Sequence, residues 1–261
     1  MNFKDFTIKE IKKILTNKEI NKKIINRLRQ DQRKGVKKLA RKYSNILQRE
    51  NEQLQKWKKM NKKVIALSKK GYELIAGIDE AGRGPLAGPV VAAAVILDSR
   101  KKIIGLDDSK KLTAKKREKL YNEIRKKSVA VGVGIIDNKE IDKYNIQKAT
   151  FMAMEKAIKN LDIIPDYLLI DGNKKIPDLN LEQEAVINGD GKINIIAAAS
   201  IIAKVTRDSI IDRYHKKYPD YGFINNKGYG TKEHIEALKK YGATTLHRLS
   251  YKIVNKYANG E

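Results

Sequence analysis

Two adjacent acids, Asp79 and Glu80, follow an apolar run and precede a glycine-rich turn. The segment reads Gly77-Ile78-Asp79-Glu80-Ala81-Gly82-Arg83-Gly84-Pro85-Leu86-Ala87-Gly88-Pro89. Neighbouring residues on a regular strand point to opposite faces, so both acids serve one site only if the strand ends there. Buried acids at a strand end are costly unless a cation or hydrogen bonds compensate. A bare Asp-Glu pair is most often a solvated turn, but this setting indicates a functional site.

Two further acids lie in comparable settings. Asp171 ends the apolar run 167–170 and precedes a glycine, and Asp190 precedes an apolar segment that begins at Ile195. Taken singly, each is better explained by a structural role, Asp171 as a turn former and Asp190 as a helix N-cap. Taken together, four carboxylates at strand ends and a helix start suit hard cations with oxygen ligands. Two such ions, roughly 4 Å apart, stabilise the attacking and leaving oxygens of phosphodiester hydrolysis.

Other residue types that often carry chemistry are less informative here. The sequence has no cysteine, which excludes disulfides and thiolate zinc sites and fits a reducing compartment. The three histidines, His215, His234 and His247, show no paired metal-ligand spacing. We therefore predict that they are surface or packing residues. No serine lies in the context of a catalytic triad, so the carboxylates are the strongest candidates for chemistry.

The charge of the chain predicts a polyanionic partner. Fifty-six Lys and Arg against 31 Asp and Glu leave +25, and a surplus that large favours nucleic acid. Residues 1–70 hold 23 basic and 6 acidic residues, or +17, and the remainder holds 33 and 25, or +8. A lysine-rich composition explains part of the excess but not its concentration. No segment joins its basic face to a strong aromatic anchor, which argues against a membrane surface.

The hydrophobic pattern predicts the elements that position these acids. Residues 1–70 contain no proline and one glycine, and we predict a small, basic helical module that binds nucleic acid. After Gly71 the composition changes, and residues 71–261 are predicted to form the catalytic domain. We predict strands over 74–79, 90–97, 129–136 and 167–170, and helices over 113–127, 146–160, 192–217 and 231–241. Strands come early and helices alternate with the later ones, which predicts an α/β fold with a mixed sheet flanked by helices.

Several motifs in the same order resemble the type 2 ribonucleases H (ribonuclease HII), over residues 72–251. These motifs are the run 77–89 and the segments 108–112, 167–172, 189–192, 197–208, 226–234 and 247–248. The resemblance implies a ribonuclease H-like fold and hydrolysis that leaves 3′-hydroxyl and 5′-phosphate ends. The N-terminal extension, which minimal members of the family lack, fits a bacterial form and leaves substrate affinity and orientation open.

The resemblance also implies roles for individual residues. Motif matching makes four residues catalytic and metal-binding at a two-metal site for Mg²⁺ or Mn²⁺: Asp79, Glu80, Asp171 and Asp190. The implied substrate-binding residues are Gly82, Arg83, Gly84, Ser109, Lys110, Lys204 and Tyr229. The Gly-Arg-Gly loop is implied to sense the ribose 2′-hydroxyl, and Tyr229 to pack at the RNA–DNA junction. Glycine lets the backbone approach the minor groove closely, and the 2′-hydroxyl distinguishes RNA from DNA. The two lysines and Ser109 are candidate phosphate contacts, whereas Ser200 is better explained by helix packing.

The implied activity is that of a metal-dependent endonuclease. It would hydrolyse the RNA strand of RNA/DNA hybrids and incise at single ribonucleotides embedded in duplex DNA, as in ribonucleotide excision repair. The expected partners are RNA/DNA hybrid and ribonucleotide-containing duplex DNA, without a membrane, and the expected state is a monomer. The N-terminus lacks the apolar stretch of a signal peptide, and the longest apolar runs are too short to span a bilayer. We therefore expect a cytoplasmic protein.

Two alternatives remain open. A type 3 enzyme would degrade longer RNA/DNA hybrids and handle single ribonucleotides poorly, and Arg83 between two glycines together with Tyr229 favours type 2. A non-catalytic protein would bind duplexes through its basic surface alone. Four acids in matching contexts argue against that alternative, because acids repel phosphate unless a metal ion intervenes.

Overall fold

The computed structural model describes residues 3–17, 21–98 and 100–258. The chain divides into two compact units, Met1–Lys58 and Lys59–Glu261. The division lies inside helix α3 (Lys34–Ser68), upstream of the boundary at residue 70 that the composition indicates. Among the described residues, none of the helices combines the length and the apolar character that crossing a bilayer requires.

The first unit is helical, as the absence of proline predicts. It contains α1 (Ile8–Asn17), α2 (Lys22–Arg29) and the first part of α3. Asn21 begins α2, and its side-chain oxygen accepts a hydrogen bond from the amide of Ile24, which satisfies a free helix-end donor. The unit has a small apolar core of its own: Phe3, Ile11, Leu15, Ile25, Leu28, Val36, Ala40 and Tyr43. Eight buried side chains fit a small module whose surface is dominated by cations.

The second unit contains a five-stranded mixed sheet in the order β3-β2-β1-β4-β5. Its strands are β1 (Ile75–Ala81), β2 (Val90–Leu97), β3 (Ser128–Ile136), β4 (Tyr167–Asp171) and β5 (Glu182–Val186). The first three strands pair antiparallel, and β4 and β5 continue the sheet in parallel with β1. The predicted mixed sheet is confirmed. Edge strand β5 was not predicted, because Glu182, Gln183 and Glu184 give it no apolar alternation.

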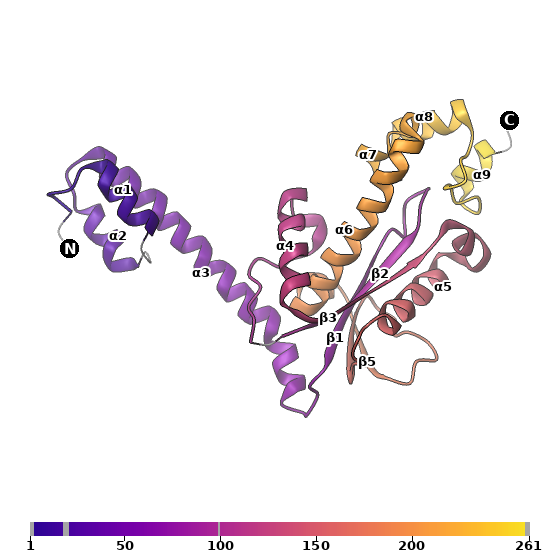
Figure 1. The fold of residues 1–261 in the computed structure, drawn as a ribbon, viewed down its shortest axis with the longest axis horizontal. Helices are drawn as coiled ribbons and strands as arrows, with labels where there is room; N and C mark the ends of the chain where they lie inside the picture. The colour runs from indigo at the N-terminus through magenta and orange to yellow at the C-terminus, as the bar shows by residue number, and fades with distance from the viewer. Residues whose placement is uncertain (1–2, 18–20, 99, 259–261) are drawn as a thin grey trace. The chain divides into compact units, whose positions relative to one another are not determined.

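Helices cover both faces of this sheet (Figure 1). Helix α5 (Asn138–Lys159) packs on one face, and α4 (Ala114–Lys127) and α6 (Asn194–Lys217) pack on the other. Because β2 is covered on both sides, its sequence is continuously apolar. Helix α5 begins before the predicted start at residue 146, since it includes an additional helical part. The two parts meet at a kink at Asn145, whose φ is 69°. The predicted helix corresponds to the part after that kink.

The C-terminal part adds three short helices, α7 (Phe223–Asn226), α8 (Lys232–Tyr241) and α9 (Lys252–Ala258). They surround a separate apolar cluster that includes Phe223 and Leu238. The end of α3 also belongs to this unit. Met60 and Leu67 are 3% and 4% exposed and lie in its two clusters beside α6. The side-chain Nδ2 of Asn194 donates to Oδ1 of Asn61 over 2.7 Å, so one side of this end of α3 packs into the second unit.

Candidate active site

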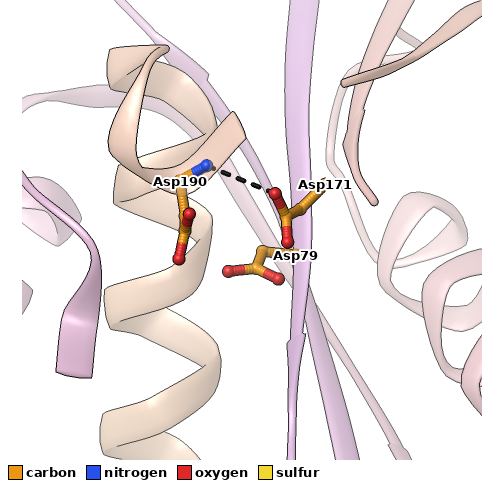
Figure 2. A group of neighbouring side chains, drawn as sticks. All are labelled: Asp79, Asp171 and Asp190. Carbon is orange, nitrogen blue, oxygen red and sulfur yellow. Dashed lines mark hydrogen bonds between the residues drawn. The ribbon is translucent and has the colours of Figure 1, made fainter. Parts of the chain in front are cut away.

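Three aspartates meet at the centre of the second unit, each from a different element. Asp79 lies on β1, Asp171 ends β4, and Asp190 lies in the short 3-10 helix η2 (Gly189–Gly191) before α6. Figure 2 shows their carboxylates turned toward one another. One carboxylate oxygen from each lies within 4.8 Å of those of the other two. Such a set of hard oxygen donors suits a divalent cation of the Mg²⁺ or Mn²⁺ type.

Local backbone contacts explain why these elements converge. At Gly77 on β1, an added Cβ would overlap the backbone of Ile195, so only glycine lets the start of α6 approach the strand this closely. The other contact joins β4 to the turn before α6. Asp171 Oδ1 accepts hydrogen bonds from the amides of Gly189 at 2.6 Å and Asp190 at 3.3 Å. Asp171 thereby fixes the turn that carries Asp190.

The surroundings of Asp79 and Asp190 disfavour their negative charges, which favours a cation between them. Asp79 is 5% exposed, and burial, followed by the charges of Glu80 and Asp171, raises its pKa well above the ordinary value. Burial, followed by Asp171 and Asp108, also raises the pKa of Asp190. Buried like charges are unfavourable unless they are protonated or a cation neutralises them. The residues present therefore fit a bound divalent metal.

Glu80 lies outside this group of three. Its Oε1 forms a salt bridge of 3.2 Å with Nη1 of Arg83, and its Oε2 is buried without a hydrogen-bond partner among the residues that the structure describes. Burial raises the pKa of Glu80, and the positive charge of Arg83 opposes that shift. The structure thus brings together three of the four predicted carboxylates and holds the fourth against the Gly-Arg-Gly loop.

The predicted substrate-binding residues gather partly around Tyr229. Tyr229 is 42% exposed, and its Cε1 lies 3.7 Å from the position of a Cβ added at Gly84. Lys204 Nζ lies 6.0 Å from the centre of the Tyr229 ring and 2.8 Å from Oδ1 of Asp208. Exposure of this tyrosine fits the prediction that it is not a core aromatic. It gives a planar apolar surface beside the Gly-Arg-Gly loop.

Ser109 and Lys110 lie together in the 3-10 helix η1 (Ser109–Lys111), but their side chains differ in exposure. Lys110 is exposed, whereas Ser109 is buried and its hydroxyl accepts a hydrogen bond from Ser200 at 2.9 Å. Ser200 is buried on α6, as its predicted packing role requires. Hydrogen bonding with Ser200 opposes part of the rise in the pKa of Asp79, whose largest cause is burial. These two serines thus connect η1 to the aspartate group.

Two buried arginines have a positioning role that the sequence analysis did not assign. Arg207 and Arg248 are 1% and 0% exposed. Arg207 donates to the carbonyls of Pro89, Ala87 and Lys227. Arg248 donates to the carbonyls of Gly82, Arg83 and Gly88. Burial lowers the pKa of Arg207 to about 10, still far above neutrality. The only sequence signal was their presence in motif segments.

His234 and His247 are packing residues, as predicted, and they form a buried hydrogen-bonded pair. Their Nε2 atoms lie 3.0 Å apart. The amide of Thr244 donates to Nδ1 of His247, so His247 carries its proton on Nε2 and donates it to His234. His234 then donates from Nδ1 to the carbonyl of Tyr229 at 2.9 Å. Both rings are neutral in this arrangement, and the pair ties the C-terminal segment to the Tyr229 loop.

The histidine pair predicts a loss of stability in acid. Burial, followed by His234, lowers the pKa of His247 from 6.5 to about 4. The contribution of neutral His247 to the free energy of unfolding is complete above the unfolded pKa. It is lost as the pH falls toward 4, and the loss amounts to about 3 kcal/mol. Urea unfolding at pH 7 and pH 4.5 should therefore show a larger loss in wild type than in His247→Gln. Equal losses in the two proteins would contradict this assignment.

Comparisons with known proteins agree with this geometry. The family model described as Ribonuclease HII matches residues 76–254, and the model described as Ribonuclease HII N-terminal domain matches residues 7–63. The chain is 49% identical over 253 residues to Ribonuclease HII of Clostridioides difficile (strain 630), covering 95% of this chain and 97% of that protein. It is 52% identical over 223 residues to Ribonuclease HII of Enterococcus faecalis (strain ATCC 700802 / V583), covering 85% and 87%.

A solved structure shows the same fold. The crystal structure of the ribonuclease H2 from Pyrococcus horikoshii OT3 is similar with a TM-score of 0.62 and 30% sequence identity. The match covers 72% of this chain and 98% of that one. The ribonuclease H-like fold is therefore confirmed. The chain belongs to the ribonuclease HII family, the type 2 ribonucleases H, which are metal-dependent nucleases.

Proposed function

We propose that this protein hydrolyses the RNA strand of RNA/DNA hybrids and incises at single ribonucleotides in duplex DNA. Cleavage would use two metal ions and leave 3′-hydroxyl and 5′-phosphate ends. The observation that carries the proposal is the group of three aspartates, whose oxygens lie within 4.8 Å of one another. Membership of the ribonuclease HII family supports the same reaction class. The neighbouring Gly-Arg-Gly loop and Tyr229 support the preference for ribonucleotides.

Asp79, Asp171 and Asp190 are the residues that would hold Mg²⁺ or Mn²⁺, with Glu80 as a fourth catalytic and metal-binding carboxylate. Glu80 Oε2 is buried and has no hydrogen-bond partner in the described part of the chain, and such an orphaned oxygen is costly unless a ligand completes it. When bound, the metal supplies electrostatic stabilisation of the oxygens that attack and leave the phosphorus. The protein side chains contribute the positions and the negative charge that retain the cations.

Substrate recognition would use two kinds of contact. The backbone of Gly82, Arg83 and Gly84 would read the ribose 2′-hydroxyl, and Tyr229 would pack at the RNA–DNA junction. Lys110 and Lys204 would contact phosphates with their ammonium groups, and Ser109 would complete that contact region. Lys204 is supported by its place near Tyr229. Lys110 is supported by its exposure and by its nearness to the aspartate group, where its positive charge opposes the rise in the pKa of Asp190.

Within residues 1–70, the compact part at 1–58 would form a basic module that binds nucleic acid, and the end of α3 would belong with residues 71–261 to the catalytic domain. The compact first unit, residues 1–58, holds 18 basic and 6 acidic residues, or +12. Contacts of this kind to phosphate are independent of sequence and sensitive to salt. We further propose that the protein acts in the cytoplasm, since the absence of cysteine fits a reducing compartment, and that it acts as a monomer.

Cleavage of three matched duplexes tests the proposed function. One duplex is all DNA, one carries a single ribonucleotide, and one has a complete RNA strand. With Mg²⁺ we expect cleavage of the second and third but not of the first, and with EDTA we expect no cleavage. A type 3 enzyme would cut the hybrid and leave the single ribonucleotide intact. A non-catalytic binder would retain all three duplexes without cutting any of them.

A further inference from the structure

Arg248 is completely buried and faces backbone oxygens of the Gly-Arg-Gly loop. Its Nη2 donates to the carbonyl of Gly82 at 2.5 Å, and its Nη1 donates to that of Arg83 at 2.8 Å. The Nε and Nη2 atoms also donate to the carbonyl of Gly88, at 3.0 and 2.9 Å. A rigid guanidinium that contacts both ends of the turn fixes its shape, and hydrogen bonds from a charged donor are strong.

These bonds determine which way the loop amides point. In a trans peptide the C=O and the next N–H point in opposite directions. Because the carbonyls of Gly82 and Arg83 point at Arg248, the amides of Arg83 and Gly84 point away from it. Among the residues that the structure describes, neither amide donates a hydrogen bond to another protein group. Two free donors therefore face away from the protein interior, where a ribose oxygen could accept from them.

Tyr251 supports the same carbonyl from a second side. Its hydroxyl donates to the carbonyl of Arg83 at 2.7 Å and accepts from Nη1 of Arg248 at 2.9 Å. The guanidinium carbon of Arg248 lies 5.2 Å from the centre of the Tyr251 ring. The same C-terminal segment reaches the Tyr229 loop through His247 and His234. One segment, residues 244–251, thus holds both elements assigned to ribonucleotide recognition.

We propose that Arg248 and Tyr251 are specificity-determining positioning residues, which orient the Gly-Arg-Gly loop so that its amides meet the ribose 2′-hydroxyl. The inference rests on the proposed function, because it assumes that this loop reads the ribose. Both residues act through backbone carbonyls of the loop, Tyr251 through that of Arg83 and Arg248 through those of Gly82, Arg83 and Gly88. Loss of either one leaves the aspartate group intact and lets the two peptide planes rotate, so recognition of the ribose falls while general duplex binding stays.

The test compares Tyr251→Phe with Tyr221→Phe in the full-length protein. Each change removes one hydroxyl and keeps the ring, but Tyr221 donates to the carbonyl of Gly242, away from the loop. We expect Tyr251→Phe to lower kcat/KM on the single-ribonucleotide duplex about five- to tenfold, the effect of one lost hydrogen bond. The inhibition constant of an all-DNA duplex of the same sequence should stay unchanged, because that duplex offers no 2′-hydroxyl. Tyr221→Phe should change neither quantity.

Arg248→Lys extends the test, since it keeps the charge and loses the fork that reaches several carbonyls. If it folds, judged by its melting temperature, its loss of kcat/KM should exceed that of Tyr251→Phe, again without a change for the all-DNA duplex. Equal kcat/KM for Tyr251→Phe and Tyr221→Phe would overturn the inference, as would a parallel weakening of all-DNA binding. Wild type that leaves the single ribonucleotide uncut would instead refute the proposed function on which the inference rests.

Discussion

Asp79→Asn is expected to abolish cleavage while leaving the metal-free protein at least as stable as wild type. Asp79 is the most deeply buried of the clustered aspartates, and burial and its neighbours raise its pKa. A neutral amide of the same shape removes the cost of this buried charge but is a poor ligand for a hard cation. Loss of a residue that only supports a metal ligand usually costs up to about a hundredfold. Turnover should fall by more than that, because Asp79 is proposed to be a ligand itself.

Melting temperatures with EDTA and with Mg²⁺ complete this experiment. With EDTA the variant should melt at or above the wild-type temperature. Mg²⁺ should then raise the melting temperature of wild type and leave that of Asp79→Asn almost unchanged, because a ligand stabilises only the state that binds it. Full turnover of Asp79→Asn at saturating Mg²⁺ would remove this residue from the site.

Asp98→Asn is the matched control. Asp98 is 8% exposed, and hydrogen bonds from Arg100 lower its pKa to about 2. Its carboxylate is therefore already compensated, so removing the charge should destabilise the protein and leave cleavage by the folded fraction unchanged. The two substitutions are chemically identical and are expected to change stability in opposite directions. That contrast separates a site prepared for a cation from a carboxylate that already has a cationic partner in Arg100.

The strand ends that carry the acids could be predicted because their chemistry differs from their surroundings. Asp171 follows an apolar strand directly, and no apolar environment retains such a group without compensation. The long helix α6 was predicted from a different signal, a sequence pattern that includes the apolar run 195–203. In contrast, β5 is polar on an edge, and only its pairing with β4 makes it a strand. Pairing between distant segments leaves no periodic signal in the sequence.

The directions of the side chains were the second feature of the site that the sequence could not predict. The sequence placed Glu80 beside Asp79 but could not show that it would pair with Arg83. The roles of Arg248 and of the histidine pair depend on contacts with residues far away along the chain, such as Gly82 and Tyr229. Buried arginines are rare unless they are paired, yet burial is a property of the folded state. Such residues become interpretable only when the carbonyls that they contact are known.

Two truncations of the N-terminus are expected to differ in their effect on the stability of the catalytic unit. Removal of residues 1–70 should destabilise the catalytic unit, because it deletes Met60 and Leu67, which are buried in its core. Losing two such side chains costs about 2–5 kcal/mol each. Removal of residues 1–58 keeps this part of α3 and should leave the melting temperature of the catalytic unit close to that in the full chain. A shared loss in both truncations would show that the first unit itself is needed for stability.

The stable truncation then isolates the role of the basic module. The deleted residues 1–58 carry +12, and each phosphate contact that is lost reduces the slope of log affinity against log salt by about 0.9. The protein without residues 1–58 should bind duplex more weakly and show a shallower slope. Its single-turnover rate at saturating protein should match that of the full chain, because uniform binding does not lower the chemical barrier. An unchanged slope, in a protein that melts normally, would show that the module does not contact the phosphates.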